Sequence, residues 1–191
     1  MYRSPVSKIK DTLFAITELK SDMSNASFGD LSEDVLEAIL EEAGKFASER
    51  IAPLNKISDT MGASLKDGEV TLPTGFKQTY KDWVNAGWNS LSAPQEFGGQ
   101  GLPLSLAVSA IEMWSGACQS FTLGPVLTLG AIEAIDNHGS EELKAMFGEQ
   151  ITSGEWAATM NLTEPQAGTD LAALKAKAEA VGDGTYKISG Q

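Results

Sequence analysis

A nearly uncharged, apolar segment runs from Leu102 to Ile135. A helix without a polar face has to be buried, and the segment is long enough for two helices that meet near Gly116 to Ser120. Serine, threonine, glutamine and glutamate residues interrupt the segment, so no continuous run of apolar side chains reaches the roughly 20 residues that a membrane-spanning helix requires. We therefore predict that other helices of the same chain cover this segment, as in a helical bundle.

Two further segments have the periodicity of amphipathic helices. The first begins after Ser32, which is placed to cap it, and reaches Ile51; Pro53 is predicted to close it. The second runs from about Thr74 to Gly87. The residues on the two apolar faces are Val35, Leu36, Ile39, Leu40, Ala43, Phe46 and Ala47 in the first, and Phe76, Tyr80, Trp83 and Val84 in the second.

Another helix is predicted from Ser140 to about Gln150. Ser140 is a suitable cap, and Glu141 and Glu142 occupy the first turn, where the helix dipole favours acidic side chains. His138, the only histidine, is interpreted as the residue that closes the preceding helix.

The pattern changes after Ser153 and Gly154. Residues 155–163 form a short run with bulky and β-branched side chains, which indicates a strand, and two short runs on either side of Gly182-Asp183-Gly184 indicate a β-hairpin. Because a lone hairpin is marginally stable, we expect the chain to be a fragment that ends inside a β domain. The predicted fold is mainly α, with an N-terminal extension (1–30), a helical domain (31–154) and the start of a β domain (155–191).

Composition excludes several classes of function. The chain has 26 acidic and 14 basic residues and a formal charge of −12, which argues against binding to nucleic acid or to an anionic membrane. The single cysteine, Cys118, excludes an internal disulfide and is interpreted as a small buried side chain. With one histidine there is neither a metal cluster nor a Ser-His-Asp set. The first residues contain no signal or transit pattern, so we expect a cytoplasmic protein.

Two glycine-containing loops are candidates for ligand binding. Residues 94–101, PQEFGGQG, lack the lysine and hydroxyl residue of a phosphate-binding Walker loop and are interpreted as a tight connection between helices. Residues 163–170, TEPQAGTD, either form an ordinary turn in which Asp170 caps the next residues, or bring the backbone close to a ligand.

The order of these sequence elements along the chain indicates a particular protein family more specifically than either loop does alone. From about Ser32 to Gln191, the stretches APQEFGGQGL, GAIEAIDNHGSEELK, SGEWAATMNLTEPQAGTDLAALKAKA and GDGTYKISGQ resemble the acyl-CoA dehydrogenase family of flavoproteins. The resemblance implies a helical N-terminal domain followed by the first strands of a β-barrel-like middle domain, within an α+β multidomain flavoprotein. Residues 1–14 are similar to the leader of longer members of the family, among them 3-methylthiopropanoyl-CoA dehydrogenases.

The resemblance also implies a flavin site between Met160 and Thr169. In the family, the part that matches Leu162 and Thr163 lies along the isoalloxazine ring, and the part that matches Gly168 and Thr169 reaches the FAD phosphates and the CoA ester. The chain departs from the family pattern in two places: Gln166 stands where glycine or glutamate is common, and Gly148-Glu149 replaces a Leu-Pro pair. The predicted FAD-binding residues are Met160, Asn161, Leu162, Thr163, Gly168 and Thr169.

The implied activity is α,β-dehydrogenation of an acyl-CoA thioester in fatty acid metabolism, with a carboxylate base and FAD as hydride acceptor. The family's base belongs to a later helical domain, so no catalytic residue is assigned in this chain, and we expect these 191 residues to be inactive alone. Glu164 is interpreted as a structural loop residue. The acyl pocket wall is predicted around Phe121, Thr122, Leu123, Val126 and Leu127, with plain core packing as the alternative.

The resemblance further implies an electron-transfer flavoprotein as acceptor and a homo-oligomeric intact protein. Two other functions remain open at this point. One is an acyl-CoA oxidase or another flavoenzyme with the same fold, which would pass electrons to oxygen. The other is a non-catalytic helical interaction module without flavin.

Overall fold

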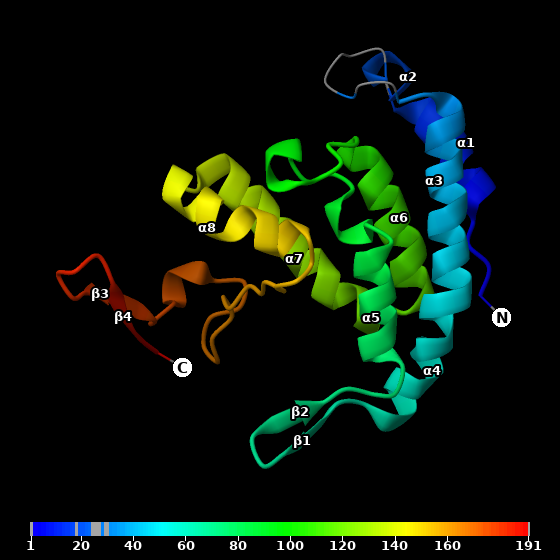
Figure 1. The fold of residues 1–191 in the computed structure, drawn as a ribbon. Helices are drawn as coiled ribbons and strands as arrows, with labels where there is room; N and C mark the ends of the chain where they lie inside the picture. Colours follow the sequence, from blue (N-terminus) through cyan, green and yellow to red (C-terminus); the bar gives the residue numbers. More distant parts are fainter. Residues whose placement is uncertain (1, 18, 24–27, 29–30, 191) are drawn as a thin grey trace. The chain divides into compact units, whose positions relative to one another are not determined.

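The computed structural model describes residues 2–17, 19–23, 28 and 31–190, and the chain divides into two units, Met1–Thr159 and Met160–Gln191 (Figure 1). The first unit is helical, as predicted. Its helices are α1 (Val6–Ile16), α2 (Leu19–Asp22), α3 (Glu33–Phe46), α4 (Ala52–Met61), α5 (Phe76–Asn85), α6 (Leu104–Ala117), α7 (Gln119–His138) and α8 (Glu141–Thr152). None of the helices in the described ranges is both long and apolar enough to cross a membrane.

Two helices begin at the serine residues that were predicted to cap them. Ser32 Oγ accepts a hydrogen bond from the amide of Val35 at the start of α3, and Ser140 Oγ accepts one from Leu143 at the start of α8. The apolar segment forms α6 and α7, which meet at the buried Cys118. These contacts confirm the predicted junction and caps, and α7 ends at His138 as expected.

The prediction that Pro53 closes the first long helix is wrong. The helix widens into a π-helical segment, Ala47–Ile51, and continues as α4 to Met61. Proline lacks an N–H and its ring collides with the carbonyl four residues earlier in an α-helix, and a π-type turn relieves this conflict. Here the amide of Ala52 donates to the carbonyl of Ala47, five residues back.

An aromatic cluster forms the core between α3, α5 and α6. The rings of Trp83 and Trp114 pack edge to face with centroids 4.1 Å apart, and Trp88 lies 5.4 Å from Trp114. The indole N–H of Trp114 donates to the carbonyl of Ala43 on α3 at 3.1 Å. Edge-to-face pairs add to the free energy of burying these large rings, so the cluster fixes α5 and α6 relative to α3.

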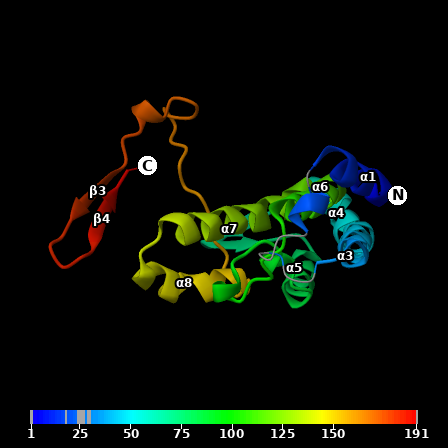
Figure 2. The same ribbon diagram turned by 90° about the horizontal axis from the view of Figure 1, so that it is seen from above.

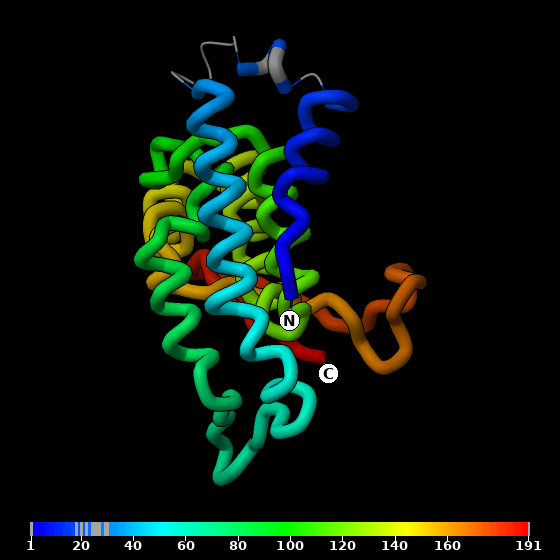
Figure 3. Tube along the Cα trace, turned by 90° about the vertical axis from the view of Figure 1, so that its right-hand side faces the viewer, coloured from blue at the N-terminus to red at the C-terminus, as the bar shows by residue number. Residues whose placement is uncertain are grey.

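The N-terminal extension lies on the helical unit. Figure 3 shows α1 alongside α3, and the apolar side of α1 buries Ile9 and Leu13. The hydroxyl of Tyr2 donates to the carbonyl of Met113 on α6 at 2.7 Å. The extension is therefore an arm that packs on the bundle, although residues 24–27 and 29–30 near its end lie outside the described residues.

Helices α7 and α8 lie side by side and form a second apolar cluster (Figures 1 and 2). A short 3₁₀ turn, Gln95–Phe97, packs on α8 and contributes Phe97 to this cluster. The buried members of the cluster are Ala93, Phe97, Ile132 and Ile151.

The strand predicted over residues 155–163 does not form. Backbone polar groups there bond to a side chain instead of a neighbouring strand: the amide of Ala158 donates to Thr128 Oγ1 at 3.1 Å, and the Thr128 hydroxyl lies 3.4 Å from the Ala158 carbonyl oxygen. A short hairpin that was not predicted, β1 (Ser64–Lys66) with β2 (Glu69–Thr71), connects α4 to α5.

The second unit contains the predicted hairpin. Strands β3 (Lys177–Ala180) and β4 (Tyr186–Ser189) pair antiparallel, with Lys177 opposite Ser189. Gly182 and Gly184 adopt φ values of 100° and 88° in the turn, a region that glycine enters at little cost.

Candidate functional site

The segment from Glu164 to Ala176 in the second unit is a loop closed by its own hydrogen bonds. Glu164 and Ala167 exchange both backbone hydrogen bonds at 3.0 Å, which makes a tight turn at Pro165-Gln166. The Glu164 side chain then reaches the far end of the loop, where its two oxygens accept the amides of Lys175 at 2.9 Å and Ala176 at 2.8 Å. One carboxylate therefore joins the two ends of a loop of about a dozen residues.

These amides control the ionisation of Glu164. The N–H of Lys175 and then that of Ala176 hold the pKa of the Glu164 carboxyl below its ordinary value, because both donate to the charged form. The residue is 8% exposed, so the carboxylate is shielded from water by the loop that it closes. This geometry agrees with the structural role expected for Glu164.

Gln166, one of the two departures from the family pattern, takes part in the same closure. Its side-chain amide donates to the carboxylate of Glu164 and lies 3.3 Å from the carbonyl oxygen of Ala173. Farther along, Asp170 Oδ1 accepts the amide of Ala172 and begins a 3₁₀ turn, Leu171–Ala173. The predicted capping role of Asp170 is confirmed, and Gln166 strengthens the loop.

The predicted flavin residues occupy two places. A concavity of about 610 Å³ is present in the second unit, and Met160 on its wall is 66% exposed. Gly168 and Thr169 are exposed in the closed loop and do not line this concavity. The lining residues are Met160, Asn161, Leu162, Thr163, Glu164, Leu174 and Ala176.

Among the described residues, no atom lies close enough to Gly168 to exclude a side chain there. A Cβ built on it meets no atom within 4 Å, and its φ lies outside the left-handed region. The fold therefore tolerates a side chain at this position. A glycine that the fold does not need is consistent with close approach of a ligand to the backbone.

The other glycine-containing loop is a structural connection. The amides of Gly99, Gln100 and Gly101 donate to carbonyls of Pro94, Ser90 and Ala93 at 2.9 to 3.0 Å. A Cβ at Gly99 would lie 2.1 Å from the Ala93 carbonyl oxygen, so only glycine fits there. Because these amides are already bonded, the loop offers no phosphate cradle, and its interpretation as a tight connection is confirmed.

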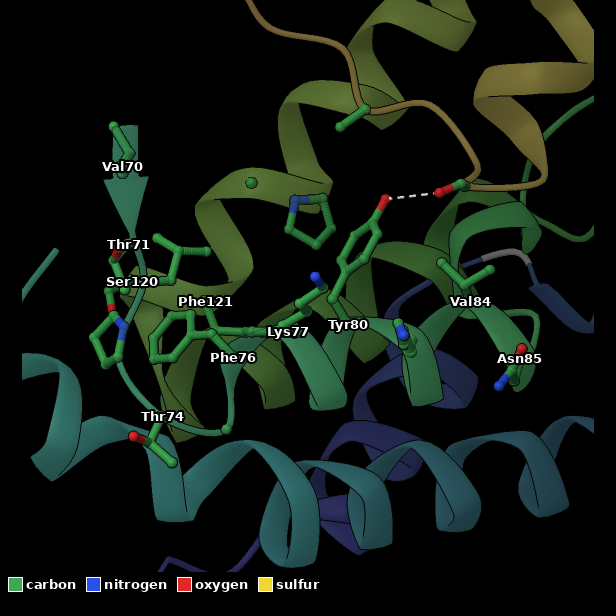
Figure 4. A pocket seen from close by; sticks show the side chains of 18 of the residues that line it. Val70, Thr71, Thr74, Phe76, Lys77, Tyr80, Val84, Asn85, Ser120 and Phe121 are labelled. Carbon is green, nitrogen blue, oxygen red and sulfur yellow. Dashed lines mark hydrogen bonds between the residues drawn. The ribbon is translucent and has the colours of Figure 1, made fainter. Parts of the chain in front are cut away.

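A pocket of about 1020 Å³ opens in the helical unit beside α5 and α7 (Figure 4). Its apolar wall includes Phe76 and Phe121, whose ring centroids are 6.0 Å apart. The hydroxyl of Tyr80 donates to the carbonyl of Gly154 at 3.1 Å, and burial raises the pKa of that phenol. The lining residues are 70–77, Tyr80, Lys81, Val84, Asn85, Ser120, Phe121, Gly124, Pro125, Gly154, Glu155 and Ala157.

The residues predicted to form the acyl pocket wall differ in burial, and only one of them lines this pocket. Phe121 is buried and lines this pocket, and Thr122 is buried without lining it. Leu123 is 54% exposed, while Val126 and Leu127 are partly buried; none of these three lines the pocket. The structure thus brings Phe121 together with α5 and leaves Leu123 and Leu127 on other parts of the α7 surface.

Sequence reasoning missed the contribution of α5 and of the β1–β2 hairpin to the pocket. The hairpin turn is Asp67-Gly68, with φ values of 53° and 83°. An Asp-Gly pair between short alternating runs is a strong hairpin signal and would have revealed it. Within the described ranges, no group of three or more histidine, cysteine, aspartate or glutamate side chains could hold a metal ion.

Comparison with known proteins defines the class of the chain. Residues 33–155 match the model of the acyl-CoA dehydrogenase N-terminal domain. The chain is 44% identical to the 3-methylmercaptopropionyl-CoA dehydrogenase of Ruegeria pomeroyi, over 99% of this chain and 32% of that protein. The fold is therefore that of an acyl-CoA dehydrogenase N-terminal domain, and the chain belongs to the acyl-CoA dehydrogenase family.

Solved structures agree on the fold. A chain from the structure of the electron transferring flavoprotein of Acidaminococcus fermentans matches with a TM-score of 0.67 and 26% identity, over 85% of this chain and 40% of that one. Butyryl-CoA dehydrogenase from Megasphaera elsdenii matches with a TM-score of 0.70 at 22% identity, over 84% of this chain and 40% of that one. The chain spans about a third of the length of the curated relative from Ruegeria.

Proposed function

We propose that the protein containing this chain is an FAD-dependent acyl-CoA dehydrogenase that introduces an α,β double bond into an acyl-CoA thioester. The observation that carries the proposal is the closed loop 164–176, with an unobstructed glycine at its exposed side, in a chain of this family. An acidic protein needs local donors to hold anionic ligands, and such a loop can present backbone amides to a diphosphate.

The residues of the second unit fit a flavin nucleotide in two respects. The concavity has exposed apolar and polar atoms on its wall, a combination that suits a flat heteroaromatic ring; the wall includes Met160, Asn161, Leu162 and Thr163. Gly168 and Thr169 leave room for phosphate oxygens and add a hydroxyl donor. Bound there, FAD would supply the redox chemistry by accepting the β hydrogen as hydride.

The role of the helical unit is to bind and shield the acyl-CoA. Apolar side chains of α7 exclude water from the acyl chain, and we place Phe121, Leu123 and Leu127 among them, with Thr169 near the thioester. Phe121 is already part of an apolar pocket, and Leu123 presents an exposed apolar surface. The carboxylate that removes the α proton is not assigned to any residue of this chain.

The proposal includes an electron-transfer flavoprotein as electron acceptor, a cytoplasmic location and a homo-oligomeric intact protein. A dehydrogenase and an oxidase with this fold differ in their electron acceptor, which is a protein for the former and oxygen for the latter. Substrate-dependent consumption of oxygen at the rate of substrate turnover would identify the oxidase, and size-exclusion chromatography of the intact protein would test the oligomer.

The decisive experiment is purification of the intact protein and measurement of its flavin absorbance and acyl-CoA-dependent reduction of an artificial electron acceptor. 3-Methylmercaptopropionyl-CoA is a suitable first substrate, since a dehydrogenase of this thioester is 44% identical to this chain. We expect stoichiometric FAD and reduction of the acceptor. A flavin-free protein that remains inactive after addition of FAD would instead favour an interaction module.

A further inference from the structure

Glu164 makes contacts that join parts of the loop distant in sequence. Its Oε2 accepts the amide of Lys175 and its Oε1 accepts the amide of Ala176, so each carboxylate oxygen receives a backbone donor. Gln166 adds a side-chain donor to Oε2. A nearly buried carboxylate that accepts three hydrogen bonds is a strong constraint, because charge-assisted bonds are stronger than neutral ones.

The contacts restrain the loop on both sides of Gly168 and Thr169. On the N-terminal side, the backbone pair between Glu164 and Ala167 fixes the turn, and Ala167 is buried beneath it. On the C-terminal side, the carboxylate of Glu164 holds the backbone at Lys175 and Ala176. Gly168 and Thr169 lie between these two fixed ends, so they lose less entropy on binding a ligand than residues of an unrestrained loop would.

From this geometry we propose that Glu164 is a positioning residue for the flavin site: its carboxylate closes the loop and thereby prearranges the backbone of Gly168 and Thr169 for a diphosphate. The inference rests on the proposed function, because the ligand is the FAD of that proposal. The proposed action of Glu164 runs through the loop amides that it accepts, and no catalytic role is assigned to it.

The arrangement requires a carboxylate rather than an amide of the same size. In a Glu164→Gln variant, one of the two acceptor oxygens becomes an NH₂ group that faces a backbone N–H or the Gln166 amide, and two donors cannot bond each other. Glu164→Asp keeps both acceptors and the charge but shortens the side chain by one methylene. The two variants therefore separate the hydrogen-bonding role of the carboxylate from its reach.

Asp183 offers a matched control in the same unit. Its Oδ1 accepts the hydroxyl of Thr185 at 2.6 Å and the amide of Thr185 at 2.9 Å in the β3–β4 turn. Asp183→Asn thus weakens a carboxylate-to-backbone contact of the same kind outside the loop 164–176. A general loosening of the unit would affect both variants, whereas loss of loop positioning is specific to Glu164.

The test uses the intact protein stripped of flavin. Affinities for FAD and for riboflavin are measured by fluorescence titration, and hydrogen exchange is followed at the amides of Lys175 and Ala176. We expect Glu164→Gln to weaken FAD binding about tenfold, the factor that corresponds to loss of one or two hydrogen bonds. Riboflavin has no diphosphate, so its affinity should fall by a smaller factor, although Glu164 also lines the concavity. Exchange at both amides should accelerate, and Asp183→Asn should retain the FAD affinity of the parent.

The following results would overturn the inference. Equal FAD affinity of Glu164→Gln and the parent refutes the positioning role and leaves the proposed function intact. Equal weakening of FAD and riboflavin shows general loss of the site. A parent protein that binds no FAD refutes both proposals. If Glu164→Gln does not fold, Gln166→Ala removes one donor to the same carboxylate, and an unchanged ratio of FAD to riboflavin affinity in that variant is decisive against the inference.

Discussion

The ring of Phe97 lies against the backbone of Gly148, so that a Cβ at position 148 would come within 2.6 Å of Phe97 Cδ1 and 2.8 Å of Cγ and Cε1. Phe97 is nearly buried by this contact and belongs to the connection 94–101. Gly148 is also the position at which the chain departs from the family's Leu-Pro pair. The departure therefore has a local cause: a glycine in α8 leaves space for the ring that fastens the connection to the helix.

We predict that Gly148→Ala destabilises the helical unit by about 1–3 kcal/mol, the usual cost of overpacking a core. The effect should appear as a lower urea midpoint with an unchanged m-value. Gly130→Ala on the exposed side of α7 is the matched control, since a Cβ there meets no atom within 4 Å. That control should stabilise by about 0.5–1 kcal/mol through helix propensity. A midpoint for Gly148→Ala at or above the parent value would contradict the packing argument.

Local signals in the sequence were sufficient for most of the helical unit. The caps at Ser32 and Ser140 and the junction near Cys118 depend on residues within one turn of each other, and they occur as expected. The hairpin around Gly182-Asp183-Gly184 is equally local. The resemblance to the acyl-CoA dehydrogenase family, carried by the order of several stretches, is confirmed by the family match.

The features that were not predicted depend on distant partners. Residues 155–163 have the composition of a strand, yet the side chain of Thr128, about thirty residues earlier, takes the backbone bonds of Ala158. Pro53 is a local stop signal that a π-helical segment overrides. The closure of the loop by Glu164 links it to residues 175 and 176, and no periodicity in the sequence indicates that pairing.

A second prediction concerns Gly168. Because its Cβ would meet no protein atom, Gly168→Val should leave the thermal unfolding of the flavin-free protein within about 0.5 kcal/mol of the parent, as for a typical surface change. The same side chain should obstruct approach of a diphosphate and weaken FAD by at least about tenfold. Calorimetry and FAD titration of the intact protein measure the two effects. Undiminished FAD occupancy in the variant would remove Gly168 from the site.

A third prediction tests the acyl wall on α7. Leu123→Ala and Leu127→Ala should shift the preference of kcat/KM towards longer or branched acyl-CoAs, by about 10-fold or more, because one or two methylenes in an apolar pocket are worth about 1–3 kcal/mol. Val35→Ala on α3 is a control of similar chemistry with a half-exposed side chain outside this helix. If the Leu123 and Leu127 variants lose stability and retain the parent's chain-length preference, these residues are packing residues only.

The last prediction concerns Glu164 and Asp183, two carboxylates of the second unit whose pKa is lowered by the groups that donate to them. The amides of Lys175 and Ala176 keep the pKa of Glu164 below its ordinary 4.5, and the hydroxyl and amide of Thr185 keep the pKa of Asp183 below its ordinary 3.8. A depressed pKa means that the folded state favours the charged form, so each contact contributes fully above the ordinary value and is lost as the pH falls through the lower, folded value. The loop and the hairpin should therefore stay ordered through mildly acidic pH.

Amide proton NMR shifts of the intact chain measure this behaviour residue by residue. The signals of Lys175 and Ala176 should titrate together with a midpoint below 4.5, and that of Thr185 with a midpoint below 3.8. Glu164→Gln should abolish the first titration and leave the second in place, while Asp183→Asn should do the reverse. Midpoints at or above the ordinary values would mean that the amides do not stabilise the charged carboxylates. The loop also carries Gly168 and Thr169. FAD affinity should therefore decline over the pH range in which the amide signals of Lys175 and Ala176 report protonation of Glu164.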